Sequence, residues 1–236
     1  MRKQKLLEND FLNLYKVLFL ILFLTFLASI SSLIKIKFKT LEQEVVFSGI
    51  LTFLVELGII LYLFHSYTFY FISLFKREFK RSFLIGILLY FFLIPILSVL
   101  TLFIFYIFKK AKIEPSPQKI IFLYLKIKSI PILVFLFFLS SIVAPFFEEI
   151  IFRGFLYSAF KSRFSVPFSI FISSLIFSLL HGDIFVFHGI FLLGIFLAYI
   201  FEKTENLWIC IGIHFANNFF SNLAIFFVKF FNLYQI

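Results

Sequence analysis

The chain has 236 residues, of which 62% are apolar and only 14% carry a formal charge. An average soluble domain is roughly half apolar and about a quarter charged, so this composition excludes an ordinary soluble protein. A disulfide scaffold is excluded as well, because Cys210 is the only cysteine in the sequence. The net charge of +10 comes from short basic clusters between apolar runs, a distribution that is typical of membrane-flanking charges and argues against nucleic-acid binding.

Apolar runs follow one another along the whole chain. A spanning helix needs about 20 apolar residues, so the chain length suits roughly seven or eight spans. Seven runs carry at most one charge each: 17–34, 45–75, 82–108, 129–147, 164–180, 184–201 and 206–228. We therefore predict an all-α fold, a polytopic transmembrane helical bundle of about seven to eight spans that forms a single membrane domain.

The first half of the chain holds three of these runs. Run 17–34 follows a basic start but has no small-residue cleavage site after it, so we expect a retained first span. Run 45–75 contains a single charge, Glu56, and is too long for one untilted crossing. We expect its end to lie at the membrane interface, where aromatic residues gather. Run 82–108 contains Pro95, which predicts a kink.

An eighth span would come from dividing run 45–75 or from a helix at 120–124. Lys and Arg beside the runs number ten on the side of the N-terminus and eight on the other side. Because cytoplasmic loops carry the excess of basic residues, this small difference predicts a cytoplasmic N-terminus. We expect an integral protein of a bacterial plasma membrane.

The fourth run, 129–147, continues without a polar break into a charged segment, and the apolar pattern then resumes as far as Phe160. Pro145 stands just before the charges and lacks a backbone N–H donor. We expect the helix to bend or restart at this proline. The acidic residues would then lie near a helix N-terminus, where negative charge is favoured.

The charged segment contains Glu148, Glu149 and Arg153, three ionisable residues where apolar ones are expected. Such residues cost about 2.5 to 3.5 kcal/mol each within a span, so they need a reason to be there. On a helix, Glu149 and Arg153 are four residues apart, which is the spacing of an ion pair. Glu148 projects about 100° away from Glu149, so the spacing predicts one paired and one unpaired carboxylate.

Two histidines and an amide interrupt the later runs. His181 stands at the end of one apolar run, and His214 and Asn218 lie four residues apart within the last run, on one helix face. Polar groups within spans usually face the interior of the bundle. We therefore expect Glu148, both histidines and Asn218 to converge there, with the neighbouring Asn217 as the alternative amide.

This set of side chains suits the attack of water on a carbonyl. A carboxylate in an apolar site can act as a general base near neutral pH, and neutral imidazoles can position the water. A carboxamide is a suitable oxyanion donor. Glu148, His181 and His214 would equally supply three ligands of a tetrahedral zinc site with water in the fourth position. Spacing alone leaves both chemistries open.

Three short motifs in this segment resemble the CPBP family of intramembrane proteases, which is named for CAAX proteases and bacteriocin-processing enzymes and is also called the Abi family. Glu148 to Arg153 matches the family's EExxxR motif, Phe177 to His181 its FxxxH motif, and His214 to Asn218 its HxxxN motif. The motifs stand in the expected order on successive helices. The resemblance covers roughly residues 130–225, and the first 120 residues match only in hydrophobicity.

The resemblance implies peptide-bond hydrolysis within the membrane. By analogy with the family, Glu148 would activate water, His181 and His214 would position it, and Asn218 would stabilise the oxyanion. The same analogy makes residues 121–236 the core that carries the motifs and residues 1–120 a group of N-terminal transmembrane helices and basic loops.

The resemblance also bears on two further residues and on a cofactor. Glu149 and Arg153 would support the motif helix. No cofactor is firmly implied, and a divalent metal such as zinc, if present, would be held by Glu148, His181 and His214. The partners implied are membrane lipid and a peptide or membrane-protein substrate.

Two other function classes stay open on the sequence. One is a catalytically silent member of the family that acts as a membrane scaffold or a bacteriocin immunity protein. The other is a small ion or proton transporter that uses the intramembrane charges as a pathway. A transporter would need paired broken helices in the two halves of the chain, for which Pro95 and Pro145 are the only candidates.

Overall fold

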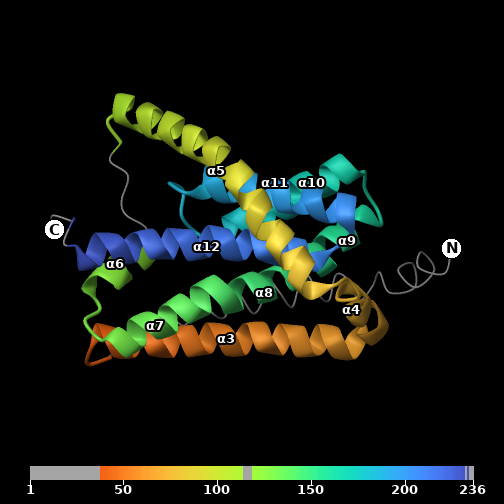
Figure 1. The fold of residues 1–236 in the computed structure, drawn as a ribbon, viewed down its shortest axis with the longest axis horizontal. Coiled ribbons are helices and arrows are strands. Elements are labelled where there is room, and N and C mark those ends of the chain that lie inside the picture. Colours follow the sequence, from red (N-terminus) through yellow and green to blue (C-terminus); the bar gives the residue numbers. More distant parts are fainter. Residues whose placement is uncertain (1–37, 114–118, 232, 234–236) are drawn as a thin grey trace.

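The structure is a computed structural model that describes residues 38–113, 119–231 and 233 (Figure 1). Within these ranges every regular element is a helix. In chain order the elements are α3 (Leu41–Ser66), α4 (Thr68–Leu74), α5 (Phe79–Lys110), α6 (Lys119–Lys126), α7 (Ile130–Phe138), η1 (Leu139–Val143), α8 (Ala144–Glu149), η2 (Ile150–Tyr157), α9 (Ser158–Lys161), α10 (Val166–Leu179), α11 (Phe187–Thr204) and α12 (Leu207–Phe230).

Five helical stretches in the described ranges are long and apolar enough to cross a membrane: Leu41–Ser66, Phe79–Lys110, Ile130–Lys161, Phe187–Thr204 and Leu207–Phe230. Helix α10 is apolar but shorter, with 14 residues. The first predicted run, 17–34, lies outside the described residues. The predicted all-α membrane bundle is confirmed, and the chain is an integral membrane protein.

The second apolar run is divided at Tyr67, because α3 ends at Ser66 and α4 begins at Thr68. Helix α4 packs against the segment that carries the predicted acids. The Tyr70 hydroxyl donates a hydrogen bond to the Gly154 carbonyl at 2.6 Å and bonds to the Ser158 hydroxyl at 2.8 Å. Burial raises the pKa of Tyr70 to about 12, so this hydroxyl keeps its proton and remains a donor.

The acidic motif lies in the middle of one helical span, Ile130–Lys161, which we call the motif helix. The expected restart at Pro145 is wrong, because the backbone at Val143 and Ile150, on either side of α8, is right-handed helical. The motif helix instead contains two π-helical segments, η1 before Pro145 and η2 after Glu149. The acids therefore do not lie at a helix N-terminus, and the wider turns accommodate the proline within a continuous helix.

The most deeply buried side chains surround the motif helix. Ile150 and Tyr157 of η2, Phe177 of α10, Leu197 of α11 and Ile213 of α12 are each no more than 1% exposed. In contrast, the outer face of α5 exposes large apolar side chains, including Phe92, Val99 and Phe103. This distribution places the motif helix in the interior and leaves apolar surface for lipid.

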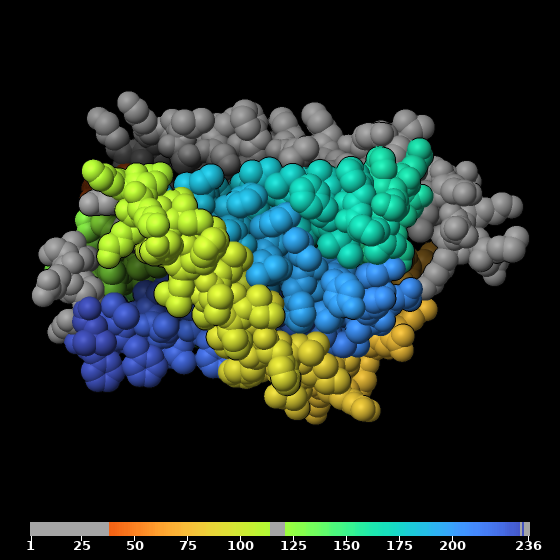
Figure 2. Space-filling model, turned by 90° about the horizontal axis from the view of Figure 1, so that it is seen from above, coloured from red at the N-terminus to blue at the C-terminus, as the bar shows by residue number. Residues whose placement is uncertain are grey.

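Helices α5 and α12 cross at a pair of glycines. A Cβ atom added at Gly86 would meet the Ile209 carbonyl oxygen and the Cα of Gly212, and one added at Gly212 would meet the Phe83 carbonyl oxygen. The two backbones are thus in direct contact, which only small residues allow. Beyond the crossing, the C-terminal half of α5 runs away from α12 (Figure 1), and α5 lies across the face formed by α10, α11 and α12 (Figure 2).

We expect Gly86→Ala to destabilise the protein by about 1 to 3 kcal/mol, the usual cost of overpacking a filled site. The added methyl group meets backbone atoms, which cannot move aside as a flexible side chain can. Gly58→Ala is the matched control, because a Cβ at Gly58 meets nothing within 4 Å. Thermal unfolding of both variants in detergent measures the difference. Equal midpoints for Gly86→Ala and the unchanged protein would contradict the close crossing.

Candidate active site

The two adjacent glutamates of the motif helix have different surroundings. The Glu149 side chain is fully buried, and its Oε1 accepts hydrogen bonds from Arg153 at 2.9 Å and from His214 Nδ1 at 2.8 Å. An ionised carboxylate only accepts, so His214 carries its proton on Nδ1 in this pair. The predicted spacing of Glu149 and Arg153 thus corresponds to a direct ion pair, and the bond to His214 adds a partner that spacing did not indicate.

Arg153 extends this contact to two further helices. Its second terminal nitrogen donates to the Gly194 carbonyl of α11 at 3.3 Å, and its guanidinium lies over the Phe177 ring of α10, 4.4 Å from the centroid. The side chain is 2% exposed. A buried arginine is tolerated here because both terminal nitrogens have acceptors and the guanidinium plane lies over an aromatic ring.

Glu148 points to another face of the helix and is 21% exposed. Its Oε2 lies 3.8 Å from His214 Nε2 and 4.0 Å from His181 Nε2. This oxygen has no hydrogen-bond partner among the described residues. The predicted unpaired carboxylate is therefore placed between two imidazoles, at distances too long for direct hydrogen bonds.

His181 follows the end of α10 and turns back onto it. Its Nδ1 lies 2.7 Å from the Phe177 carbonyl oxygen, which can only accept, so Nδ1 is the donor. The Phe177 ring makes edge contacts with the rings of both His181 and His214. With Nδ1 protonated in both rings, Nε2 of each faces Glu148, and in that neutral tautomer Nε2 is an acceptor.

Three accepting atoms therefore face one another: Glu148 Oε2, His181 Nε2 and His214 Nε2. A water molecule fits such a space, because it can donate one hydrogen to the carboxylate and the other to an imidazole. Two hydrogen bonds of about 2.8 Å to one water oxygen reach across the observed separations of 3.8 and 4.0 Å.

Asn218 is held by the irregular part of the motif helix. Its Nδ2 donates to the Ser140 carbonyl of η1 at 2.9 Å, and its Oδ1 accepts from Asn217 at 3.0 Å. In η1 the N–H of Ala144 bonds to the Leu139 carbonyl, five residues earlier. In the same pattern the next N–H would bond to Ser140, but residue 145 is a proline. The Asn218 amide takes the place of the missing donor and keeps one N–H for another partner.

A second amide supports the same segment. Asn222 Nδ2 lies 2.8 Å from the Ser140 hydroxyl and 2.9 Å from the Ser141 hydroxyl. Asn218 and Asn222 are one helical turn apart on α12, so both face η1. These contacts fix the position of Asn218 relative to the motif helix.

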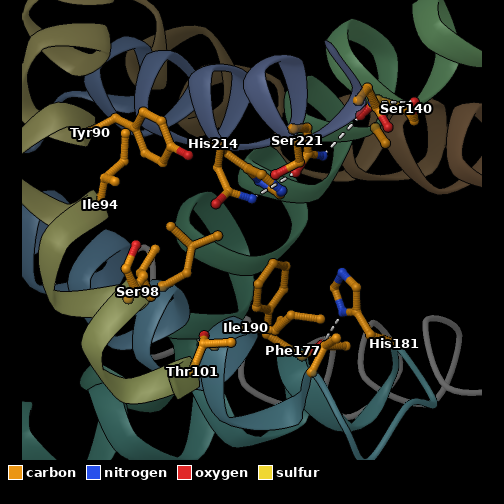
Figure 3. A pocket seen from close by; sticks show the side chains of 18 of the residues that line it. Tyr90, Ile94, Ser98, Thr101, Ser140, Phe177, His181, Ile190, His214 and Ser221 are labelled. Atoms are coloured by element: carbon orange, nitrogen blue, oxygen red, sulfur yellow. Dashed lines mark hydrogen bonds between the residues drawn. The ribbon is translucent and has the colours of Figure 1, made fainter. Parts of the chain in front are cut away.

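A cavity of about 760 Å³ brings the predicted residues together (Figure 3). Glu148, His181, His214 and Asn218 all line it, whereas Glu149 and Arg153 lie behind the wall. Helix α5 contributes a further wall that the motifs did not predict, with Tyr90, Ile94, Ser98 and Thr101. The sequence carries only a weak indication of this wall: Tyr90, Ser98 and Thr101 are polar positions at helical spacing within an uncharged run.

A zinc ion suits the chemistry of these acceptors, but their spacing is too wide. Tetrahedral ligands about 2.0 to 2.1 Å from zinc are about 3.3 Å from one another. The separations here are 3.8 and 4.0 Å. In the part of the chain that the structure describes, no group of three His, Cys, Asp or Glu side chains is placed to hold a metal ion. We therefore derive no step through a metal.

We expect Arg153→Ala to destabilise the protein by about 3 to 5 kcal/mol, because it leaves the Glu149 charge without its cationic partner. Lys161→Ala is the control on the same span, since Lys161 pairs with Glu202 at 2.6 Å and is 40% exposed. An exposed pair contributes less than about 1 kcal/mol. Chemical unfolding in detergent compares the two, and similar losses for both would contradict the role of the buried pair.

Comparison with known proteins relates the motif-bearing segment to a known protein family. Residues 130–220 match the family model of Type II CAAX prenyl endopeptidase Rce1-like proteins. No solved structure matches the chain significantly.

Two curated proteins are similar over part of their length. The putative membrane peptidase YdiL of Bacillus subtilis (strain 168) is 32% identical over 94 residues, which are 40% of this chain and 37% of that protein. The membrane-embedded CAAX protease MroQ of Staphylococcus aureus (strain USA300) is 34% identical over 115 residues, 46% of this chain and 44% of that protein. The matches thus span less than half the length of either relative. Residues 130–220 thus match the CPBP family, in its Rce1-like CAAX protease branch.

Proposed function

We propose that this protein is an intramembrane endopeptidase that hydrolyses a peptide bond with a water molecule activated by Glu148. The observation that carries the proposal is the arrangement of three acceptors, in which Glu148 Oε2 faces His214 Nε2 at 3.8 Å and His181 Nε2 at 4.0 Å. The family match and the two similar peptidases support the same reaction. The substrate is a peptide or membrane protein within the bilayer, and nucleic acid is no part of the function.

In the proposed reaction, Glu148 removes a proton from the water as the water oxygen attacks the peptide carbonyl. One of the two imidazoles, of His181 or His214, accepts the second hydrogen, and together they hold the oxygen in position. The free N–H of Asn218 stabilises the negative charge on the carbonyl oxygen of the tetrahedral intermediate. Glu148 then gives its proton to the leaving amine, and the C–N bond breaks.

Glu149 and Arg153 act in this proposal through His214. The Glu149 carboxylate, 2.8 Å from Nδ1, keeps the proton on that nitrogen and leaves Nε2 as the acceptor. Arg153 balances the Glu149 charge through the buried ion pair at 2.9 Å. We propose that residues 121–236 carry this chemistry and that residues 1–120 complete the membrane domain.

We expect Glu148→Gln to lower the rate of cleavage by at least about 10² to 10⁴, the usual contribution of a general base. The assay uses the purified protein in liposomes and a panel of synthetic single-span peptides that carry a fluorophore and a quencher. Glu44→Gln is the control, since Glu44 is exposed near the start of α3. Thermal unfolding checks that both variants stay folded. Full activity in Glu148→Gln would disprove the assigned mechanism.

We expect cleavage to continue after exhaustive chelation, because the separations of 3.8 and 4.0 Å exceed the roughly 3.3 Å between tetrahedral zinc ligands. Elemental analysis of the purified protein provides a second measurement, and we expect no stoichiometric zinc. His214→Ala should abolish cleavage whether or not chelator is present. Loss of cleavage with chelator that added zinc restores would assign the three residues to a metal instead.

A further inference from the structure

Helix α5 presents one face to the cavity of the candidate site. Tyr90, Ile94, Ser98 and Thr101 line the cavity, and their spacing of four, four and three residues places them along one side of the helix. Figure 3 shows these side chains on α5 across the cavity from His181 and Phe177. The family motifs lie on the motif helix, α10 and α12, so this face is a wall of the cavity to which no motif assigns a role.

Tyr90 is the most constrained side chain on this face. It is 6% exposed, and its ring stacks on Phe220 of α12 with centroids 6.0 Å apart and planes 6° from parallel. Its hydroxyl makes no hydrogen bond to any described residue and, in Figure 3, points into the cavity. The other deeply placed tyrosine hydroxyls do have partners: Tyr70 bonds to Gly154, Tyr124 to Ser140 and Tyr157 to Glu202.

A buried tyrosine hydroxyl usually finds a hydrogen-bond partner, because an unmade bond in an apolar site costs free energy. The rigid stacking on Phe220 prevents Tyr90 from turning toward bulk solvent without losing the ring contact. The partner of this hydroxyl must therefore enter the cavity.

Two more hydroxyls on the same face are free. Ser98 and Thr101 make no side-chain hydrogen bond within the described residues, although a helical Ser or Thr can bond to the carbonyl one turn earlier. Elsewhere in this protein, such bonds are made, from Ser174 to Ile170 and from Thr204 to Ile200. The cavity face of α5 thus offers a row of neutral donors and acceptors to whatever the cavity holds.

The charges of the side chains that line the cavity limit the kind of molecule that can bind there. Among the described lining residues, Glu148 is the one side chain with a fixed charge, and the opposite wall is apolar, with Ile190 and Leu193. A peptide main chain carries polar groups without charge, and in an apolar site each of them needs a partner. An extended, uncharged peptide segment adds no charge to the cavity, and its main-chain groups can bond to the hydroxyl groups of α5.

Tyr90 also lies close to the reacting groups. Its stacking partner Phe220 is six residues after His214, which is about 9 Å along α12. An extended peptide advances about 3.3 Å per residue, so this distance is less than three residues of a bound substrate.

We propose that the Tyr90 hydroxyl binds the substrate directly, by donating a hydrogen bond to a main-chain carbonyl of an uncharged, extended peptide segment within three residues of the bond that is cleaved. This inference rests on the proposed function only in placing the peptide in the same cavity. It makes α5 a substrate-binding wall of the site.

The test measures peptide binding in protein that cannot cleave. Glu148→Gln protein in detergent is titrated with the single-span peptides of the cleavage assay, and fluorescence polarisation gives the Kd. We expect addition of Tyr90→Phe to weaken binding by about threefold to tenfold, the effect of one lost neutral hydrogen bond. Tyr90→Phe keeps the ring, so the stacking on Phe220 and the thermal midpoint should be unchanged.

Tyr106→Phe, added to the same Glu148→Gln protein, is the matched control, because Tyr106 is an exposed tyrosine on the outer part of α5. Its Kd should equal that of Glu148→Gln alone. Equal affinity for the Tyr90→Phe protein overturns the proposal, and so does the absence of any peptide binding to Glu148→Gln. In otherwise unchanged protein, Tyr90→Phe should raise KM by the same factor while kcat changes less. If no panel peptide is cleaved, the proposed function fails, and the binding comparison still decides the role of Tyr90.

Discussion

The buried carboxylate of Glu149 is the contact on which the rest of the site depends. A charge at this depth in a membrane is unfavourable unless it is paired, and Glu149 has partners on two sides, Arg153 and His214. Arg153 in turn reaches the Gly194 carbonyl of α11 and the Phe177 ring of α10. Four elements are thereby held in register around one charge, and the same charge determines which nitrogen of His214 carries the proton.

The irregular backbone of the motif helix serves the same site. Non-helical backbone is tolerated within a membrane only where its polar groups find partners. The π-helical segment η1 together with Pro145 leaves the Ser140 carbonyl without a backbone donor, and Asn218 supplies one from α12. The proline therefore does not end the helix. It creates the acceptor that fixes the amide proposed to stabilise the oxyanion.

The shape of the cavity follows from the crossing of α5 and α12. Because Gly86 and Gly212 have no side chains, the two backbones touch at one point. The two helices diverge beyond this contact (Figure 1), and the cavity opens beside His214 and Asn218. Tyr90, Ser98 and Thr101 of α5 face this space together with Ile94, whereas Phe92 and Val99 are exposed on the outside of the helix, so α5 lies between the site and the outer surface.

The sequence by itself determined the membrane class, the approximate positions of the long described helices and the identity of the motif residues, because these depend on local patterns. Long apolar runs form helices wherever they occur, and four-residue spacing is enough to pair Glu149 with Arg153. The sequence could not indicate the Glu149–His214 bond or the bond from Asn218 to the Ser140 carbonyl. Nor could it indicate the contact of α5 with α12 at two glycines, or that Tyr90 faces the cavity. Each of these contacts joins residues that lie between 65 and about 130 positions apart in the sequence. Such contacts depend on how the helices rotate and cross, which packing across the whole bundle decides.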